Sequence, residues 1–470
     1  MSLLQHPGAI PVGVTGYDVD NSVKLEPDNS EYFQRAATGS DGSLTTWTFS
    51  LWLKRTKLSH ACIFYSQGGN GRVRFESDDT FSFRYKSGHE FTTTRRFRDC
   101  ASWYHIVIAV DTTQSTASNR IKIYINGVQE TMSGTQPDQN ETSDFGEFGS
   151  ITAQLGQFTE GSYYFSGYMT EFYWIDGIQQ LPTAFGEFDS DSNIWKPIKY
   201  TGSFGNEGVY LDFEDSSQLG KDVSGNSNHY TEQNITAIDQ ATDTCTNNFC
   251  TMNHTHRTNG NIRTQEGGTY VTTDGGSGWC NMVATMGMSK GKWYWEALFY
   301  DDGDAEDVHI GLVAANDPWI PSRQGGYYLG NIATHGNSGW DLDGGANYNQ
   351  GGSWGNPSRG DKLMVAYDAD NTTLYYGING TWGNSSNPAN DSNGIELSSY
   401  WWSADPTYVD FAFPAVSVYQ GNFMKGFNFG GYCAWTISSG NADADGYGNF
   451  EYAPPTGFYA LCSKNLAEHG

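Results

Sequence analysis

The sequence predicts an all-β protein of two antiparallel β-sandwich domains in tandem. Two widely separated stretches, 103–127 and 362–380, each have the pattern of a strand, a polar turn, a second strand and an Asn-Gly turn. Asn-Gly between two alternating apolar runs is a strong signal for a β-hairpin. The composition agrees, because 57 glycines, 15% aromatic residues and only 17% charged residues are typical of a turn-rich β protein rather than a helical or disordered one.

Strands with a period of two fill the first half of the chain. Alternation over 46–53 places Trp47, Phe49, Leu51 and Leu53 on one face, and 80–85 has the same pattern. Residues 208–215 and 222–228 are interpreted as closing this first sandwich, and the start of an incomplete repeat is the alternative.

The order of these strands resembles a known family. Segments 47–55, 103–107, 123–127 and 165–172 are similar to successive strands of the laminin-G-like branch of the concanavalin A-like lectin/glucanase superfamily. In that family they form a jelly-roll sandwich. In the second half, segments 291–297, 309–313, 360–368, 374–380 and 413–418 follow in the order of a SPRY domain, a second concanavalin A-like sandwich that recognises partners through its loops.

These patterns predict four parts of the chain. Residues 1–20, rich in Pro and Gly, are an N-terminal arm, with an unstructured tail as the alternative. Residues 21–240 form the laminin-G-like sandwich and 241–262 a polar linker. Residues 263–470 form the SPRY-like sandwich with a C-terminal tail.

The charge of the chain excludes some partners. A formal charge of −27, from 53 acidic and 26 basic residues, repels phosphate backbones and anionic bilayers, so neither nucleic acid nor membrane is expected as a partner. The start of the sequence lacks a basic and then apolar signal segment, and no apolar run is long enough to span a bilayer, so synthesis in a cytoplasm without export by a signal peptide is expected.

The seven cysteines are scattered and odd in number, which predicts buried free thiols. A local Cys245–Cys250 disulfide is an alternative. A zinc site formed by these two cysteines with His254 and His256 is another, although the spacing matches no common zinc motif.

No catalytic constellation is expected. Glucanases of the superfamily carry Glu-x-Asp-x-x-Glu, and the nearest string here, Glu187-Phe188-Asp189-Ser190-Asp191-Ser192, has a serine in place of the last acid. A retaining glycosidase needs two carboxyl groups about 5 to 5.5 Å apart. A glycoside hydrolase is therefore only the alternative to a non-enzymatic protein.

Oxygen ligands at alternate positions indicate a candidate calcium loop near the C-terminus. Gly446 stands at its sharp turn, as in an EF-hand-like loop, but the bidentate Glu expected at the twelfth position is missing. An Asp- and Gly-rich connecting turn is the alternative. The candidate ligands are Asn441, Asp443, Asp445, Tyr447 and Asn449.

Tryptophans in irregular, Gly- or Asp-flanked stretches of the second half are candidate contacts for a ligand. Aromatic faces can stack on the C–H surfaces of sugars while carboxylates bind hydroxyls, and Trp and Tyr also anchor protein interfaces. Packing within loops is the alternative for each residue. The candidates are Trp340, Asp341, Asp343, Tyr348, Trp354, Trp401 and Trp402.

Segments 246–253 and 452–462 are similar to phrases in virion proteins of tailed phages, particularly of marine bacteria, that carry these two sandwiches in this order. The resemblance implies a structural protein on the virion surface, a tail fibre or receptor-binding adhesin that recognises a host-surface glycan. Alternatives are a capsid decoration or head-fibre protein, a polysaccharide depolymerase, and a cellular adhesion module. The expected partners are host glycan or other virion proteins, in a symmetric homo-oligomer.

Overall fold

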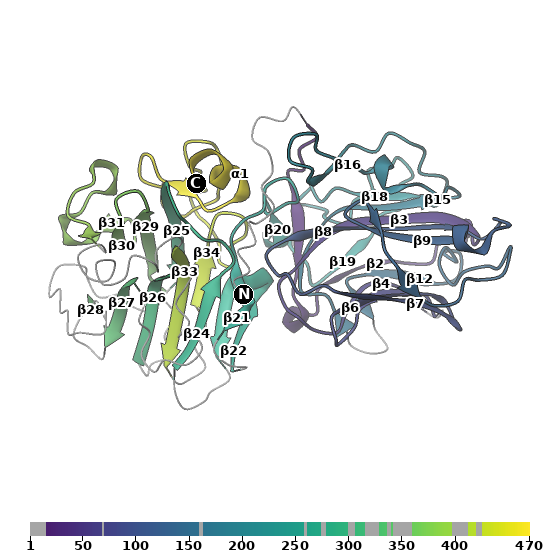
Figure 1. The fold of residues 1–470 in the computed structure, drawn as a ribbon, viewed down its shortest axis with the longest axis horizontal. Helices are drawn as coiled ribbons and strands as arrows, with labels where there is room; N and C mark the ends of the chain where they lie inside the picture. The colour runs from purple at the N-terminus through teal and green to yellow at the C-terminus, as the bar shows by residue number, and fades with distance from the viewer. Residues whose placement is uncertain are drawn as a thin grey trace. The chain divides into compact units, whose positions relative to one another are not determined.

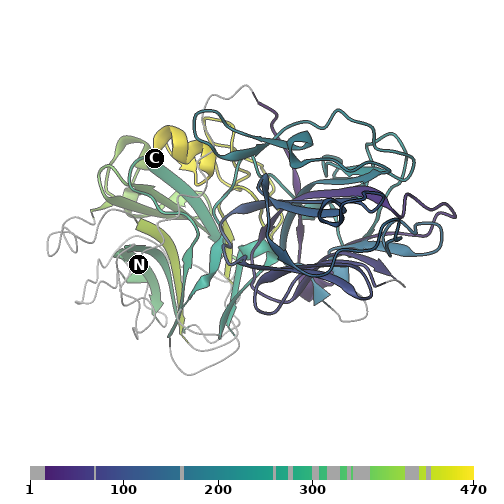
Figure 2. The same cartoon turned by 45° about the vertical axis from the view of Figure 1, so that its right-hand side comes forward.

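The computed structural model describes residues 16–67, 70–158, 163–257, 261–273, 279–298, 306–314, 329–335, 340–341, 360–396, 412–419 and 425–470. These residues confirm the all-β fold class and contain one α-helix, α1 (Ser463–His469). The chain divides into two compact units, Gly13–Asn247 and one that includes Asn248–Gly470 (Figures 1 and 2). Short 3-10 helices connect strands at Pro27–Asn29, Ala117–Asn119, Pro182–Ala184, Ala237–Asp239, Glu266–Gly268, Gly383–Ser385 and Pro388–Asn390.

The first unit is a sandwich of two antiparallel eight-stranded sheets. Sheet A has the order β10 (Val128–Gln129), β9 (Ile121–Ile125), β8 (Trp103–Asp111), β3 (Thr46–Arg55), β15 (Gly167–Asp176), β1 (Ser22–Leu25) and β20 (Gln240–Ala241), with β18 (Val209–Leu211) also paired to β15. Sheet B has the order β11 (Met132–Ser133), β7 (His89–Arg96), β6 (Thr80–Lys86), β5 (Arg72–Phe75), β4 (Ala61–Gln67), β12 (Thr152–Leu155), β2 (Tyr32–Arg35) and β19 (Thr231–Gln233). Two short hairpins accompany them, β13 (Gln157–Phe158) with β14 (Tyr163–Tyr164) and β16 (Gly186–Phe188) with β17 (Trp195–Pro197).

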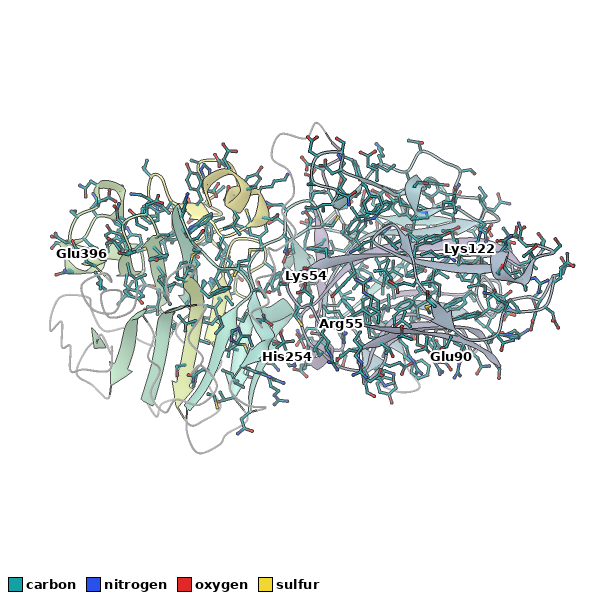
Figure 3. All side chains as sticks on the ribbon, viewed as in Figure 1. Lys54, Arg55, Glu90, Lys122, His254 and Glu396 are labelled. Atoms are coloured by element: carbon teal, nitrogen blue, oxygen red, sulfur yellow. The ribbon has the colours of Figure 1, made fainter. Side chains whose placement is uncertain are left out.

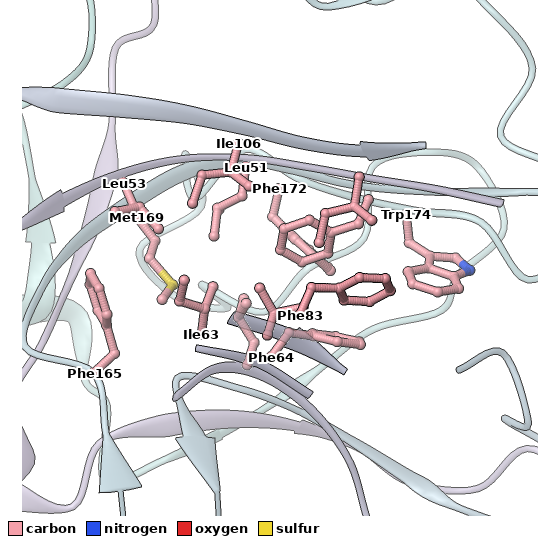
Figure 4. Packing of buried hydrophobic residues seen from close by; sticks show 14 of the residues in the cluster. Leu51, Leu53, Ile63, Phe64, Phe83, Ile106, Phe165, Met169, Phe172 and Trp174 are labelled. Atoms are coloured by element: carbon pink, nitrogen blue, oxygen red, sulfur yellow. The ribbon is translucent and has the colours of Figure 1, made fainter. Parts of the chain in front are cut away.

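The core of this unit lies between the two sheets. In Figure 4, Leu51, Ile106 and Phe172 of sheet A face Ile63, Phe64 and Phe83 of sheet B. The predicted face of Trp47, Phe49, Leu51 and Leu53 is confirmed, because all four side chains are buried in this core. Trp47 stacks on Trp174 with ring centroids 4.7 Å apart.

The second unit is also a sandwich of two sheets. The six-stranded sheet C has the order β21 (Met252–Arg257), β24 (Trp279–Ala284), β33 (Ala412–Tyr419), β26 (Glu306–Ala314), β27 (Leu329–His335) and β28 (Trp340–Asp341). The nine-stranded sheet D has the order β22 (Ile262–Gln265), β23 (Tyr270–Thr273), β34 (Lys425–Asn428), β25 (Lys292–Leu298), β29 (Lys362–Asp368), β30 (Thr373–Ile378) and β31 (Thr381–Trp382), with β32 (Ile395–Glu396) on β30 and β35 (Tyr459–Ala460) on β25. Its buried core includes Trp293, Trp295, Val365, Val416 and Phe427.

The predicted boundaries differ from the structure in one segment. The unit boundary falls between Asn247 and Asn248, inside the predicted linker 241–262. Part of that linker is strand, because β20 pairs with β1 and β21 pairs with β24. β21 is the terminal strand in the described order of sheet C. A strand that faces solvent on one side carries polar residues, so its sequence resembles that of a linker. Residues 209–233 supply β18 and β19 to the first sandwich, in agreement with the interpretation that this region closes it.

Residues 1–15 of the predicted arm lie outside the described residues. The rest of the arm packs on the first unit. The Tyr17 hydroxyl lies 3.1 Å from both carboxylate oxygens of Glu171, and the Val19 backbone exchanges two hydrogen bonds with the Thr246 hydroxyl.

The buried carboxylate of Glu296 binds residues 451 and 452 of the C-terminal segment on the outer side of sheet D. Glu296 of β25 points away from the core formed by Trp293 and Trp295, and its side chain accepts hydrogen bonds from the Tyr294 hydroxyl and the Asn428 amide. It also accepts from the backbone N–H groups of residues 451 and 452, at 3.0 and 2.7 Å. Burial raises the pKa of Glu296, although these four donors oppose the increase.

The two predicted Asn-Gly hairpins are confirmed and are alike in detail. Asn126 and Asn379 have φ of 48° and 47°, and the glycines that follow them have φ of 77° and 84°. Positive φ at both central residues is the requirement of a type I′ turn. Each Asn side chain accepts a hydrogen bond from a backbone N–H of the neighbouring strand in the sheet, at His105 of β8 (2.7 Å) and at Lys362 of β29 (2.9 Å).

We predict that Asn126→Ala lowers the free energy of unfolding of the first unit by about 1–2 kcal/mol, because alanine is strained at positive φ and cannot accept the His105 hydrogen bond. Asn126→Gly, which relieves the strain but still loses the hydrogen bond, is expected to cost less. Differential scanning calorimetry measures both variants, and Asn379→Ala should affect the other transition. Equal stability of Asn126→Ala and the wild type would contradict this account of the turn.

Candidate functional site

Most of the predicted ligand-contact residues lie outside the described residues: Asp343, Tyr348, Trp354, Trp401 and Trp402. Trp340 and Asp341 form β28, whose backbone pairs with Thr334 and Ala333 of β27. The ligand site in the second half of the chain therefore stays a prediction.

The predicted calcium loop is described, and Asp443 is its centre. One carboxylate oxygen of Asp443 accepts from the backbone N–H of Asp445 (3.0 Å) and of Tyr447 (2.9 Å). The other accepts from the backbone N–H of Ala460 (2.9 Å) and the side-chain amide of Asn465 (2.8 Å). The Asp443 carboxylate therefore links this loop to β35 and α1.

The other predicted calcium ligands also have protein contacts. Asn441 forms a β-bridge with Phe450, Asp445 lies 2.7 Å from the imidazole Nε2 of His469, and the Asn449 carbonyl accepts from Asn428. Over the described part of the chain, no group of three or more His, Cys, Asp or Glu residues is placed to hold a metal. Calcium binding stays a prediction, and the alternative, a connecting turn, accounts for these contacts.

The glucanase-like segment forms the turn between β16 and β17. Asp189 accepts hydrogen bonds from the backbone N–H of Ser192 (2.9 Å), the Ser192 hydroxyl (2.9 Å) and the backbone N–H of Asp191 (3.1 Å). The two hydrogen bonds from Ser192 stabilise the ionised carboxylate and are the main reason that the pKa of Asp189 is lowered to about 2. An acid catalyst must carry a proton at its working pH, so Asp189 is suited to holding this turn rather than to protonating a leaving group.

All seven cysteines are free, and six of them are buried. The prediction of free thiols is confirmed, and Cys245 and Cys250 lie on opposite sides of the unit boundary. Burial raises the pKa of the Cys100 thiol to about 12 and that of Cys62 further.

The structure brings together a polar row that the sequence did not show, on the side of sheet B that faces away from the core. The strand registers pair Gln34 with Gln154, Gln154 with Tyr65, Tyr65 with Arg72, Arg72 with Arg84, and Arg84 with Glu90. Directly paired residues of neighbouring strands point to the same face. Their neighbours along each strand, such as Val73, Phe83 and Phe91, lie in the core.

We call Tyr65, Arg72, Arg74, Ser82, Arg84 and Glu90 the arginine face. Glu90, labelled in Figure 3, is shared by all three arginines: it accepts from Arg84 at 2.5 and 3.1 Å, from Arg74 at 3.4 Å and from Arg72 at 3.5 Å. The Ser82 hydroxyl donates to the same carboxylate at 3.0 Å. The charged side chains are 13% to 30% exposed, so they are partly desolvated yet accessible.

The electrostatics of this face are unbalanced. Burial and the neighbouring charges of Arg74 and Arg84 lower the pKa of Arg72. Burial opposes ionisation of Glu90, but the hydrogen bond and charge of Arg84 outweigh it and lower the Glu90 pKa. The buried Nε of Arg72 has no hydrogen-bond acceptor among the described residues. Within the described part of the chain, the face therefore keeps donor capacity without an acceptor.

An aromatic cluster adjoins the arginine face. Phe158 of β13 contacts Tyr65 edge to face, with ring centroids 4.6 Å apart, and lies 5.8 Å from the Arg72 guanidinium. Tyr163 of β14 stacks on Phe158 and on His60. Guanidinium donors, a carboxylate acceptor and aromatic rings thus lie together, a set that can bind hydroxyl or acidic groups and stack on an adjacent ring.

A second buried carboxylate lies on the outer side of sheet A. Glu171, only 3% exposed, has φ of 52° at the bulge of β15 and accepts from the hydroxyls of Tyr17, Tyr173 and Tyr210. Burial raises the pKa of Glu171 to about 7, against the opposing effect of the tyrosine hydrogen bonds. This carboxyl group connects the described part of the N-terminal arm, through Tyr17, with β15 and β18.

Comparisons with known proteins agree with the fold of the first unit. Residues 27–177 match the model of the concanavalin A-like lectin/glucanases superfamily, and this stretch contains the whole arginine face. No curated protein matches the sequence. Among the residues described here, no helix is long and apolar enough to cross a membrane.

Solved structures with some similarity include SPRY domains, a pentraxin and a bacterial protein. The SPRY domain of human HERC1 is 15% identical with a TM-score of 0.26, covering 37% of this chain and 96% of that domain. A heptameric SAP-like pentraxin from Limulus polyphemus is 14% identical with a TM-score of 0.27, covering 35% and 80%. A proposed carbohydrate binding protein from Bacteroides ovatus is 17% identical with a TM-score of 0.33, covering 46% and 60%. At these values the similarities carry no functional argument.

We predict that stability of the first unit depends on pH through Glu171. The folded-state pKa of about 7 exceeds the ordinary value of 4.5, so the stabilising effect of protonation is complete below about pH 4.5 and is lost as pH rises through 7. The shift corresponds to about 3 kcal/mol. Denaturant unfolding from pH 4.5 to 8 should show this decline in wild type and a flatter profile in Glu171→Gln. Glu187→Gln, which changes an exposed carboxylate of the same unit, is the control, and a profile unchanged in Glu171→Gln would contradict the assignment.

Proposed function

We propose that this chain is a non-enzymatic recognition protein that binds carbohydrate through the arginine face of its first sandwich. The observation that carries the proposal is the row of arginine, glutamate and aromatic side chains across the outer side of a concanavalin A-like sheet. Sugar hydroxyls both donate and accept hydrogen bonds. The face offers guanidinium donors, the Glu90 acceptor and aromatic rings within one surface.

We further propose that the protein is exposed on the virion of a tailed phage and acts as a tail-fibre or receptor-binding adhesin for a host-surface glycan. The support is the resemblance of segments 246–253 and 452–462 to phage virion proteins with the same two sandwiches. Attachment through the N-terminal arm in a symmetric homo-oligomer is part of this proposal. A capsid decoration or head-fibre role is the alternative position on the particle.

Binding of the fluorescently labelled full chain to candidate host bacteria tests the adhesin proposal. We expect saturable binding that is competed by polysaccharide purified from the same host surface. A parallel series with a calcium chelator tests the predicted calcium loop, since loss of binding on chelation would indicate a metal-dependent site. Absence of binding to a host that the phage infects would contradict the adhesin and favour a role within the particle.

We predict that the protein does not depolymerise the polysaccharide that it binds. Release of reducing ends from host polysaccharide should stay at background for the wild type, because Asp189 is held ionised in a turn. The proposal would fail if reducing ends accumulated with wild-type protein and disappeared with Glu187→Gln or Asp189→Asn. That result would establish the depolymerase alternative.

A further inference from the structure

We infer that the arginine face binds an acidic polysaccharide, whose carboxylate or sulfate groups are held by Arg72 and Arg84. This inference rests on the proposed carbohydrate recognition and narrows its ligand to one chemical class. Three observations support it: the placement of like charges, the local charge of the segment, and the weak contact between Arg72 and Glu90.

The register places two guanidinium groups directly opposite each other. Arg72 pairs with Arg84 on neighbouring strands, and Arg74 lies two residues farther along β5. Like charges in directly opposed positions destabilise a sheet. Glu90 offsets part of this repulsion by bonding to all three arginines, but one carboxylate cannot neutralise three guanidinium groups. Glu76 pairs with Arg74 at 2.6 Å, which leaves three arginines to two glutamates.

The local charge is opposite to that of the chain. Residues 72–98 contain seven Lys or Arg and four Asp or Glu, and two of these bases, Lys86 and Arg95, pair with Glu141 and Glu130 outside the segment, which leaves a formal charge of +1 in a chain of −27. Charges beyond about 10 Å are largely screened at 0.1 M salt, so the local sign decides what binds here. An acidic polymer that the rest of the surface repels is therefore attracted to this segment.

The weakest contact with Glu90 belongs to the most buried arginine of the row. Among the described residues the buried Nε of Arg72 has no acceptor, and another of its nitrogens reaches Glu90 only at 3.5 Å. A guanidinium binds carboxylate and similar oxyanions through two parallel hydrogen bonds. A ligand carboxylate or sulfate between Arg72 and Arg84 would accept from the accessible nitrogens of both guanidinium groups and replace part of the contact with Glu90. Glu90 then acts as an internal competitor of the ligand.

The accessible charged part of the row lies on three strands, because Gln154 and Tyr65 are only 2% and 1% exposed. Neighbouring strands lie about 4.8 Å apart, so Arg72, Arg84 and Glu90 span roughly 10 Å. Phe158 and Tyr163 lie beside Tyr65 in the middle of the row, where their rings can stack on a sugar ring next to the acidic group.

Titration calorimetry of the full chain with three polymers tests the inference: alginate as a carboxylate polymer, dextran sulfate as a sulfate polymer, and neutral dextran. We expect binding to alginate or dextran sulfate, weakening with added NaCl, and none to dextran. Arg72→Gln and Arg84→Gln should each weaken binding about tenfold, as expected for loss of a charge-assisted hydrogen-bond pair. Arg96→Gln is the matched control, because it removes the same charge from a residue of β7 whose side chain is 50% exposed and lies outside the row.

Glu90→Gln should change the affinity for the acidic polymer in the opposite direction to the arginine variants. Removing the competitor should strengthen binding to the acidic polymer about threefold or more, although it removes a carboxylate from the face. Thermal unfolding of each variant identifies loss of fold, and the Glu90 variant and the salt series remain informative if an arginine variant does not fold.

The outcomes separate this inference from the proposed function. Binding to neutral dextran alone, or binding to acidic polymers that is equal in Arg72→Gln, Arg84→Gln and Arg96→Gln, overturns the inference and leaves carbohydrate recognition standing. Binding to none of the three polymers overturns the inference. Absence of binding to host cells and to their purified polysaccharide overturns the proposed function itself.

Discussion

Burial of a carboxylate on the outward side of a central strand is the constraint on which each unit depends. A strand in a sandwich has one face in the core, and its other face must be either solvated or covered. In the first unit, Glu171 of β15 collects three tyrosine hydroxyls and lies beside the apolar cover formed by Phe185, Tyr200 and neighbouring residues on sheet A. In the second unit, Glu296 of β25 collects backbone N–H groups of the C-terminal segment. Because the outer side of sheet A is covered in this way, the outer side of sheet B is the one that presents charged and aromatic groups.

The fold was largely predictable because its information is local. Alternation fixes which side of a strand faces the core, as at Trp47 and Leu51, and the Asn-Gly pairs at 126 and 379 fix two hairpins with their positive φ angles. Strand β21 was missed since polar residues on an edge strand have the composition of a linker. The predicted calcium pattern was ambiguous for a related reason. An aspartate whose carboxylate accepts hydrogen bonds from nearby backbone N–H groups stabilises a turn, as Asp443 does. Such a turn has the same residue types as a metal-binding loop.

The arginine face could not be predicted from the sequence, for a different reason. Arg72, Arg84 and Glu90 meet only through the register of β5, β6 and β7, and a shift of one residue would turn each side chain into the core. The available signal was the cluster of basic residues between 72 and 98 in an acidic chain, alternating with Val73, Phe75 and Phe83. By contrast, the candidate ligand contacts of the second half were selected for residue type and for their irregular, Gly- or Asp-flanked context, and five of the seven fall outside the described residues.

The buried cysteines have a consequence for durability. A thiol reacts with oxidants and disulfides as the thiolate, and burial raises the pKa of Cys100 to about 12 and that of Cys62 further, so almost none is ionised near neutral pH. All seven cysteines are free, and these two present little thiolate to oxidise. They therefore persist unmodified in a reducing and in an oxygenated environment, without redox-dependent maturation or ageing.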